Sequence, residues 1–171
     1  MVTTSNFHVR PATALDVRAI AAMRQPNEGA GRKLLKLELV SLFEKVPEFL
    51  VAENEAGEVV GAGALHIMWE DLAEVRSLIV RDDQRGKGIG HLIVKALIER
   101  ATTLGIKRLF CLTFETEFFA KHGFAEISDV PVDEETYAEL VRSNDDGVAE
   151  FLDLARVKEN TLGNTRMLAL I

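Results

Sequence analysis

The sequence predicts a single domain over residues 1–171, of the α/β (α+β) class, with a mixed, mostly antiparallel sheet and flanking helices. Three observations favour this class. The composition, 47% hydrophobic and 27% charged residues, is ordinary for one globular domain. Segments of strand length alternate with segments of helical period, and no Pro-, Gly- or Ser-rich linker separates them. Over Glu74–Phe114, a strand, a glycine-rich turn, a helix and a strand follow one another, which requires two parallel strands.

The first third of the chain predicts five elements. In order, they are a strand over His8–Arg10, helices over Ala14–Gln25 and Arg32–Val46, and hairpin strands over Phe49–Glu53 and Val59–Met68. Thr13 with Asp16 three residues later is typical of a capping box at the start of the first helix. The second helix is predicted from a leucine-rich stripe that ends before Pro47, and the hairpin from the turn residues Asn54–Gly57.

The remaining elements follow from the same signals. They are strands over Glu74–Val80, Arg108–Phe114 and Thr165–Ile171, and helices over Ile89–Leu104, Thr116–His122 and Asp133–Arg142. The helix from Ile89 has the clearest apolar face, and Gly105 ends it. Ser143–Asn164 shows no clear pattern and is predicted to be irregular, with a role as a lid over a substrate.

Charge and cysteine content exclude several functions. The net charge of −7 argues against nucleic-acid binding, which depends on neutralising phosphates. A single cysteine, Cys111, excludes an internal disulfide and fits a reducing, cytoplasmic location. No signal peptide or membrane-spanning apolar run is visible, and the four histidines lack the paired spacing of a metal site.

The segment Gln84–Gly90 has the composition and position of a phosphate-binding turn. It lies between a strand and a helix, where backbone N–H groups and the positive helix end attract anions. Its glycines permit close backbone approach, and Arg85 and Lys87 add positive charge. The spacing matches neither the dinucleotide fingerprint G-x-G-x-x-G nor the P-loop, which argues against an oxidoreductase or a P-loop NTPase.

The spacing Arg85-x-x-Gly88-x-Gly90, together with Phe119-Ala120-Lys121-His122-Gly123-Phe124, resembles the GNAT N-acetyltransferase family. A narrower resemblance, to the acetyltransferase domain of N-acetylglutamate synthases and especially their short stand-alone actinobacterial type, is carried by Gly63–His66, Ala73–Arg76, Leu112-Thr113, Glu117–Phe124 and Asn164–Leu168. It implies transfer of acetyl from acetyl-CoA to the α-amine of L-glutamate or L-glutamine in a ternary complex, as a step of arginine biosynthesis.

The same resemblance implies where the cofactor binds. Acetyl-CoA would be wedged between two splayed parallel strands, with pantetheine on the backbone of Leu78 and Val80 and the pyrophosphate on the glycine turn. The implied cofactor residues are Leu78, Ile79, Val80, Arg85, Gly86, Lys87, Gly88, Ile89, Gly90 and Phe119. Many members of the family carry a tyrosine as general acid where this chain has Phe119, which cannot donate a proton.

Two residues are candidates for catalysis, and several for acceptor binding. Glu74 is the candidate general base, and His66 the candidate for assisting proton removal or binding a substrate carboxylate. A dicarboxylate acceptor needs cations or other donors. The candidates are Arg32, Lys36, Arg76, Thr113, Arg142, Lys158, Thr165 and Arg166.

Two alternatives stay open. One is a GNAT enzyme that acetylates a protein lysine, a polyamine or an antibiotic, which the acidic net charge favours slightly. The other is a non-enzymatic acetyl-CoA sensor, which Phe119 favours because it cannot act as an acid. The C-terminal strand, if it lies at a sheet edge, can pair two protomers into a homodimer.

Overall fold

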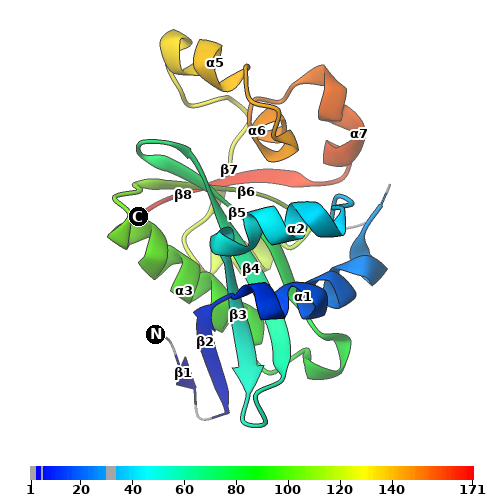
Figure 1. Cartoon of the computed structure of the whole chain (residues 1–171). Helices are drawn as coiled ribbons and strands as arrows, with labels where there is room; N and C mark the ends of the chain where they lie inside the picture. The colour runs from blue at the N-terminus through cyan, green and yellow to red at the C-terminus, as the bar shows by residue number, and fades with distance from the viewer. Residues whose placement is uncertain (1–2, 5, 30–33) are drawn as a thin grey trace.

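The protein is built around one mixed sheet, seen in a computed structural model that describes residues 3–4, 6–29 and 34–171 (Figure 1). Eight strands of the described residues form the order β1-β2-β3-β4-β5-β6-β8-β7. They are β1 Thr3–Thr4, β2 Phe7–Pro11, β3 Phe49–Asn54, β4 Val59–Trp69, β5 Leu72–Val80, β6 Arg108–Thr113, β7 Ala125–Glu126 and β8 Thr165–Leu170. Only β5 and β6 are parallel within this sheet, which confirms the predicted mixed class.

The helices cover both faces of the sheet and one end of it (Figure 1). The α-helices are α1 Val17–Arg24, α2 Leu39–Lys45, α3 Ile89–Thr103, α4 Thr116–Ala120, α5 Glu134–Leu140, α6 Asp146–Phe151 and α7 Lys158–Thr161. Short 3-10 turns join them at η1 Ala14–Asp16, η2 Gln25–Asn27, η3 Val46–Glu48, η4 Asp82–Gln84 and η5 Ala155–Val157. None of the described helices combines the length and the apolar character needed to cross a membrane.

The alternation of small residues along β4 places helices on its two faces. Gly61 and Gly63 face α3 so closely that a Cβ atom there would lie 2.9 Å and 2.8 Å from Ile93 side-chain atoms. Ala62 and Ala64 face the opposite way, into the apolar cluster formed with α1 and α2. Because successive side chains of a strand point to opposite faces, this pattern lets α3 approach one face while α1 and α2 pack on the other.

The second predicted helix starts later than expected. Only Leu39–Lys45 of the predicted Arg32–Val46 is α-helical, and the prediction for 32–33 lies outside the described residues. Leu34 and Leu37 still pack against the cluster around α1, but from a non-helical segment. Of the predicted stripe, Leu42 is buried in α2, whereas Leu39 and Phe43 are exposed. The apolar residues of this segment therefore do not form one buried face of a helix, and this part of the prediction was wrong.

The predicted irregular segment Ser143–Asn164 is partly helical, so that prediction was wrong as well. Asp145 caps α6 by accepting a hydrogen bond from the Val148 backbone, and η5 and α7 follow. Val148, Phe151 and Leu152 pack on the sheet in a third apolar cluster, with Phe151 edge-on to Phe110 at 5.1 Å between ring centroids. A cap followed by apolar residues at helical spacing was the signal that identifies α6.

The C-terminal strand β8 does not form the edge of the sheet. It lies between β6, with which it pairs from Arg108↔Leu170 to Thr113↔Thr165, and the two-residue strand β7. The expectation of an exposed C-terminal edge was therefore wrong over the part of β8 that β7 covers. The strands β1 and β7 were not predicted, because two residues are too few to produce a pattern.

Candidate active site

The parallel strands β5 and β6 separate from one another partway along their length. They pair only at Leu72↔Arg108, Ala73↔Leu109 and Glu74↔Phe110, although β5 continues to Val80. Beyond Glu74, the edge of β5 that faces β6 is left without a strand partner in the described sheet. A cavity of about 460 Å³ opens there.

A bulge in β5 accompanies this separation. Against β4, the register shifts between Ala62↔Ile79 and Ala64↔Arg76, and Ser77 adopts a left-handed φ of +56°. Such a bulge bends a strand. Arg24 of α1, 2% exposed, holds the bulge by donating to the Ser77 hydroxyl at 2.5 Å and to the Leu35 carbonyl at 2.7 Å. Sequence analysis missed Arg24 because nothing local distinguishes it from the other arginines.

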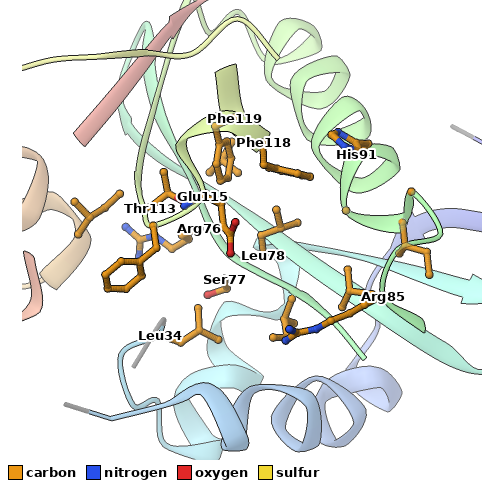
Figure 2. A pocket seen from close by; sticks show the side chains of 18 of the residues that line it. Leu34, Arg76, Ser77, Leu78, Arg85, His91, Thr113, Glu115, Phe118 and Phe119 are labelled. Carbon is orange, nitrogen blue, oxygen red and sulfur yellow. The ribbon is translucent and has the colours of Figure 1, made fainter. Parts of the chain in front are cut away.

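The cavity in the cleft is lined by most of the predicted cofactor residues (Figure 2). These are Leu78, Ile79, Val80, Arg85, Gly86, Gly88, Ile89, Gly90 and Phe119. Lys87 is not among the lining residues, because its ammonium turns back to donate to the Gln84 side chain at 2.9 Å. Phe119 packs edge-on between Phe118 and Phe124, so it serves as a wall of the cleft.

The glycine turn lies at the N-terminus of the 15-residue helix α3. Gly86 and Gly88 have φ of +78° and +81°, and Gly88 is the N-cap. Glycine is the residue that adopts this conformation without strain, and the N-terminus of a helix presents unpaired backbone N–H groups. His91, in the first turn of α3, stacks on Phe118 and lies 2.8 Å from His122 between ring nitrogens. Sequence analysis did not identify His91 as a wall of the cleft.

Replacing Gly88 with alanine is expected to weaken acetyl-CoA binding about tenfold, since left-handed backbone costs an L-residue roughly 1–2 kcal/mol. Isothermal titration calorimetry measures this change. Gly105→Ala is the matched control, because Gly105 has φ of +82° at the other end of α3 and does not line the cleft. Equal loss of affinity in the two variants would contradict a specific role for the turn at Gly88.

A second cavity, of about 280 Å³, adjoins the first. The two share lining residues from four segments of the chain: Leu34, Val75, Arg76, Ser77, Leu112, Phe114 and Asn164. The second cavity also has charged walls, with acidic groups from η3, β5 and α6 and basic groups from α1, α2 and β5. A donor in the cleft and a polar acceptor in the second cavity would thus meet along β5.

Glu74 lies in the wall of the second cavity, 4% exposed. The Arg76 guanidinium donates to its Oε2 atom from Nη2 at 2.6 Å and from Nε at 3.1 Å. Burial raises the pKa of the Glu74 carboxyl, and the charge and hydrogen bonds of Arg76 oppose that rise. Both hydrogen bonds end on Oε2, so Oε1 has no hydrogen-bond donor among the described residues.

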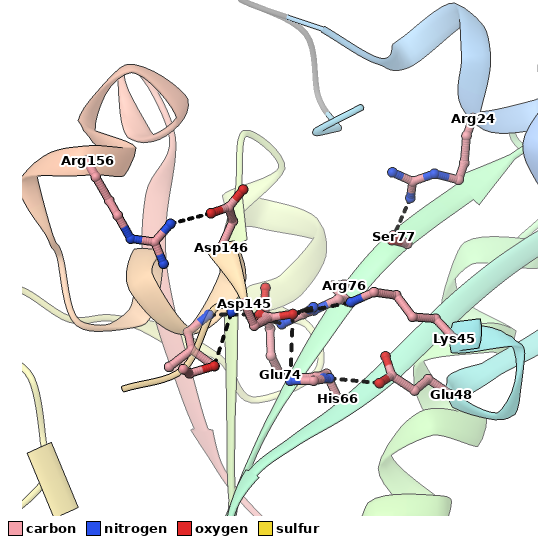
Figure 3. A network of polar contacts seen from close by, with 12 residues as sticks. Arg24, Lys45, Glu48, His66, Glu74, Arg76, Ser77, Asp145, Asp146 and Arg156 are labelled. Atoms are coloured by element: carbon pink, nitrogen blue, oxygen red, sulfur yellow. Dashed lines mark hydrogen bonds and ion pairs between the residues drawn. The ribbon is translucent and has the colours of Figure 1, made fainter. Parts of the chain in front are cut away.

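Asp145 joins three elements around this pair, β5, α2 and α6 (Figure 3). Its carboxylate accepts from Arg76 at 2.7 and 2.8 Å, from Lys45 of α2 at 3.3 Å, and from the Val148 backbone of α6 at 3.0 Å. Burial opposes ionisation of Asp145, but the hydrogen bonds and charge of Arg76 outweigh burial and hold its pKa below the ordinary value. Sequence analysis did not identify Asp145 as part of the site.

His66 lies behind this network and does not line either cavity. Its Nδ1 atom is 2.8 Å from Glu48, and its Nε2 atom is 3.8 Å from Asp145 (Figure 3). The ring therefore links η3 to α6. The predicted role of His66 in direct contact with the acceptor is not supported by this position.

The structure brings only some of the predicted acceptor residues to the cavities. Arg76 and Lys36 line the second cavity, Thr113 lines the first, and Arg32 lies outside the described residues. Four others lie away from both cavities, which corrects the prediction for them: Arg142 pairs with Glu139, Lys158 pairs with Asp153, Arg166 donates to the Phe151 and Asp129 carbonyls, and Thr165 pairs with Thr113 in the sheet. Their side chains or backbones are used by the local fold.

Cys111 is buried in β6, with 1% exposure. Burial, with a smaller contribution from the negative charge of Glu74, raises the pKa of its thiol. A neutral, buried thiol is a poor nucleophile. The site therefore favours direct transfer over an acetyl-cysteine route.

A splayed parallel strand pair, a glycine turn at a helix N-terminus and an adjoining polar cavity are the features that the resemblance to acetyl-CoA-dependent transferases implies. A family model described as Acetyltransferase (GNAT) family matches residues 18–124. The chain therefore belongs to the GNAT family and is an acetyl-CoA-dependent N-acetyltransferase.

Three proteins similar to this chain are amino-acid acetyltransferases or solved structures with bound coenzyme A. An Amino-acid acetyltransferase of Mycobacterium tuberculosis is 52% identical over 165 residues, covering 95% of this chain and 94% of the relative. A solved Mycobacterium tuberculosis structure in complex with CoA and NLQ has a TM-score of 0.92 at 51% identity, covering 96% and 99% of the two chains. The Neisseria gonorrhoeae N-acetylglutamate synthase, with coenzyme A and N-acetyl-glutamate, has a TM-score of 0.75 at 24% identity and shares the fold; the match covers 98% of this chain and 36% of that one.

Proposed function

We propose that this N-acetyltransferase acts on an amino acid, transferring acetyl to the α-amine of L-glutamate or L-glutamine as a step of arginine biosynthesis. One observation carries the proposal: the cofactor cleft and a charged cavity of amino-acid size meet at Val75–Ser77 on β5. Two reactants held on either side of one strand can react directly, without a covalent enzyme intermediate.

The residues of the cleft fit acetyl-CoA, which supplies an activated thioester. The backbone of β5 beyond Glu74 lacks a strand partner, so Leu78 and Val80 would hold the amide groups of the pantetheine arm. The N–H groups of the turn at Gly86–Gly90, together with Arg85, would hold the pyrophosphate. An N–H of β5 would polarise the acetyl carbonyl.

The acceptor side needs a group that removes a proton from the ammonium. Glu74 is buried in the cavity wall with one carboxylate oxygen directed away from Arg76's hydrogen bonds, and we assign it the role of general base. Of the predicted cations, Arg76 and Lys36 line this cavity, and Arg76 already donates hydrogen bonds to Glu74 and Asp145. Phe119 cannot protonate the departing thiolate, so the proton that the thiolate takes up must come from another source.

The choice of amino-acid acceptor is supported by the name of the Mycobacterium tuberculosis relative and by the N-acetyl-glutamate in the Neisseria gonorrhoeae structure. The test is thiol release from acetyl-CoA with each of the twenty amino acids supplied separately. Turnover with glutamate or glutamine at least tenfold above the others is expected. Faster turnover with spermidine or a lysine peptide would replace the amino-acid assignment, and tight acetyl-CoA binding without any turnover would favour a sensor.

We further propose that the segment Ser143–Asn164, through α6, covers the acceptor cavity. It supplies Asn144, Asp145, Gly147 and Glu150 to the wall of that cavity. The expectations of a single domain over residues 1–171, a cytoplasmic location, a homodimer and the absence of a metal ion stay predictions.

A further inference from the structure

Helix α6 lies directly on the candidate base. A Cβ atom on Gly147, the second residue of this helix, would be 2.4 Å from Glu74 Oε2 and 2.3 Å from Arg76 Nη2. Cβ atoms essentially never lie so close to another heavy atom, so a side chain at this position would require a shift of α6 or of the pair. The backbone of α6 therefore rests on the Glu74–Arg76 pair, and glycine is what permits the contact.

A second buried carboxyl follows one helical turn later. Glu150 lies three residues after Gly147, so the two share a face of α6. Glu150 is 5% exposed and lines the acceptor cavity together with Glu74. No described residue donates a hydrogen bond to its side chain. A carboxyl that is buried without such a donor is penalised when it ionises.

The two carboxyls lie in each other's electric field. Burial, followed by the negative charge of Glu74, raises the pKa of Glu150 to about 8. Burial also raises the pKa of Glu74, against the charge of Arg76. Two carboxyls in one low-dielectric site lose their protons in two coupled steps that belong to the pair.

Other charged or titratable groups face the pair from every neighbouring element. They are Arg76 on β5, His66 on β4, Cys111 on β6, Lys45 on α2, Glu48 on η3, and Asp145 and Asp146 at the start of α6. Arg76 lowers the pKa of both carboxyls, whereas Asp145 raises both. Burial and the charge of Glu74, with smaller contributions from Asp146 and Asp145, thus favour the protonated form of Glu150.

We infer that Glu150 and Glu74 form one proton-sharing pair, in which Glu150 is the positioning residue that makes Glu74 a stronger base toward the acceptor ammonium. This inference rests on the proposed function. It goes beyond that function because it assigns the basicity of the site to a pair of carboxyls on two elements, and not to Glu74 alone.

The protons balance as follows. The fully ionised pair takes one proton from the acceptor ammonium, which leaves a neutral amine and a singly protonated pair. The amine forms the C–N bond to the acetyl carbon, and the C–S bond breaks. The second proton lost by the nitrogen ends on the coenzyme A thiolate, and the pair later returns its proton to solvent. The base is effective because the pair binds its last proton at a pH close to the working range.

The first test compares the pH dependence of kcat/KM in the wild type and in Glu150→Gln. The wild-type value should rise with an apparent pKa near 8, and this rise should be absent from the variant. The activity ratio should grow from near one at pH 6 to about tenfold or more at pH 9, because an isolated Glu74 is the weaker base. Ionisation of the acceptor amine affects the wild type and the variant equally, so it does not change the ratio of their activities. Parallel profiles with a constant ratio would overturn the inference, since a purely structural role lowers activity equally at every pH.

The second test does not depend on turnover. In protein labelled with ¹³C at glutamate Cδ, one carboxyl should titrate near pH 8, and its signal should disappear in Glu150→Gln. Glu135→Gln, which removes an exposed charge from α5, is the control and should retain it. If every glutamate titrates below about pH 6, the pair does not exist. A titration near pH 8 in an enzyme that acetylates no amino acid would retain the pair and reject the proposed acceptor.

Discussion

Replacing Glu74 with glutamine is expected to lower kcat/KM for the amine acceptor by about 10²–10⁴-fold, the range typical of a lost general base. The Kd of acetyl-CoA should change little, because Glu74 lines the acceptor cavity and not the cofactor cleft. Glutamine keeps the shape of the side chain and a hydrogen-bond acceptor for Arg76 while removing the basic oxygen. Steady-state kinetics at saturating acetyl-CoA and calorimetric titration of the cofactor measure the two quantities.

Two further measurements make the Glu74 prediction specific. At high pH the acceptor amine loses its proton in solution, so the variant should recover part of its activity as pH rises relative to the wild type. Glu99→Gln, the same change at an exposed position of α3, should behave as the wild type. Loss of activity accompanied by loss of acetyl-CoA binding would indicate a disturbed fold and contradict the assigned role.

Replacing Gly147 with alanine is the other change with a large expected effect. The added methyl group would lie 2.3 Å from Arg76 and 2.4 Å from Glu74, so either α6 or the ion pair must move. We expect kcat to fall at least tenfold, since catalytic groups displaced by about an ångström lose up to 10²-fold in rate. Overpacking of this kind costs typically 1–3 kcal/mol of stability, which thermal unfolding measures.

Gly57→Ala separates this effect from a general loss of stability. Gly57 has φ of +78° in the β3–β4 turn, far from both cavities, and an alanine there is strained without touching the site. This control should lose about 1–2 kcal/mol of stability and keep the wild-type kcat. Full activity in Gly147→Ala would show that α6 does not rest on the Glu74–Arg76 pair.

The elements around the cofactor could be predicted from the sequence because their signals are local. The strand before the turn, the two glycines and the apolar face of α3 all lie within Leu72–Thr103, and each has its own pattern. The splay of β5 from β6 was implied by a family resemblance only. The bulge at Ser77 lies where the two strands separate, and it is held by the buried Arg24. Because these two residues are 53 positions apart, their contact leaves no local pattern in the sequence.

The acceptor side was the part that local patterns could not supply. Asp145 reaches Arg76 across 69 positions of sequence, and Glu150 lines the same cavity as Glu74 only because α6 folds back over β5. Some predicted acceptor cations lie away from the cavities because they bind other parts of the fold, as Arg166 binds the carbonyl of Phe151. Chemistry that depends on two distant elements requires the fold before it can be recognised.

The short pairing between β5 and β6 has a consequence for folding. Three residue pairs join β5 to β6, and beyond Glu74 the two strands separate along the cleft in which the donor is proposed to bind. A ligand that contacts both β5 and β6 binds the folded state and not the unfolded chain. It stabilises the fold by about 2.7 kcal/mol when its concentration is about a hundred times its Kd. Bound acetyl-CoA would then support the sheet as well as take part in the reaction. The melting temperature of the protein therefore becomes a measure of the supply of its own donor.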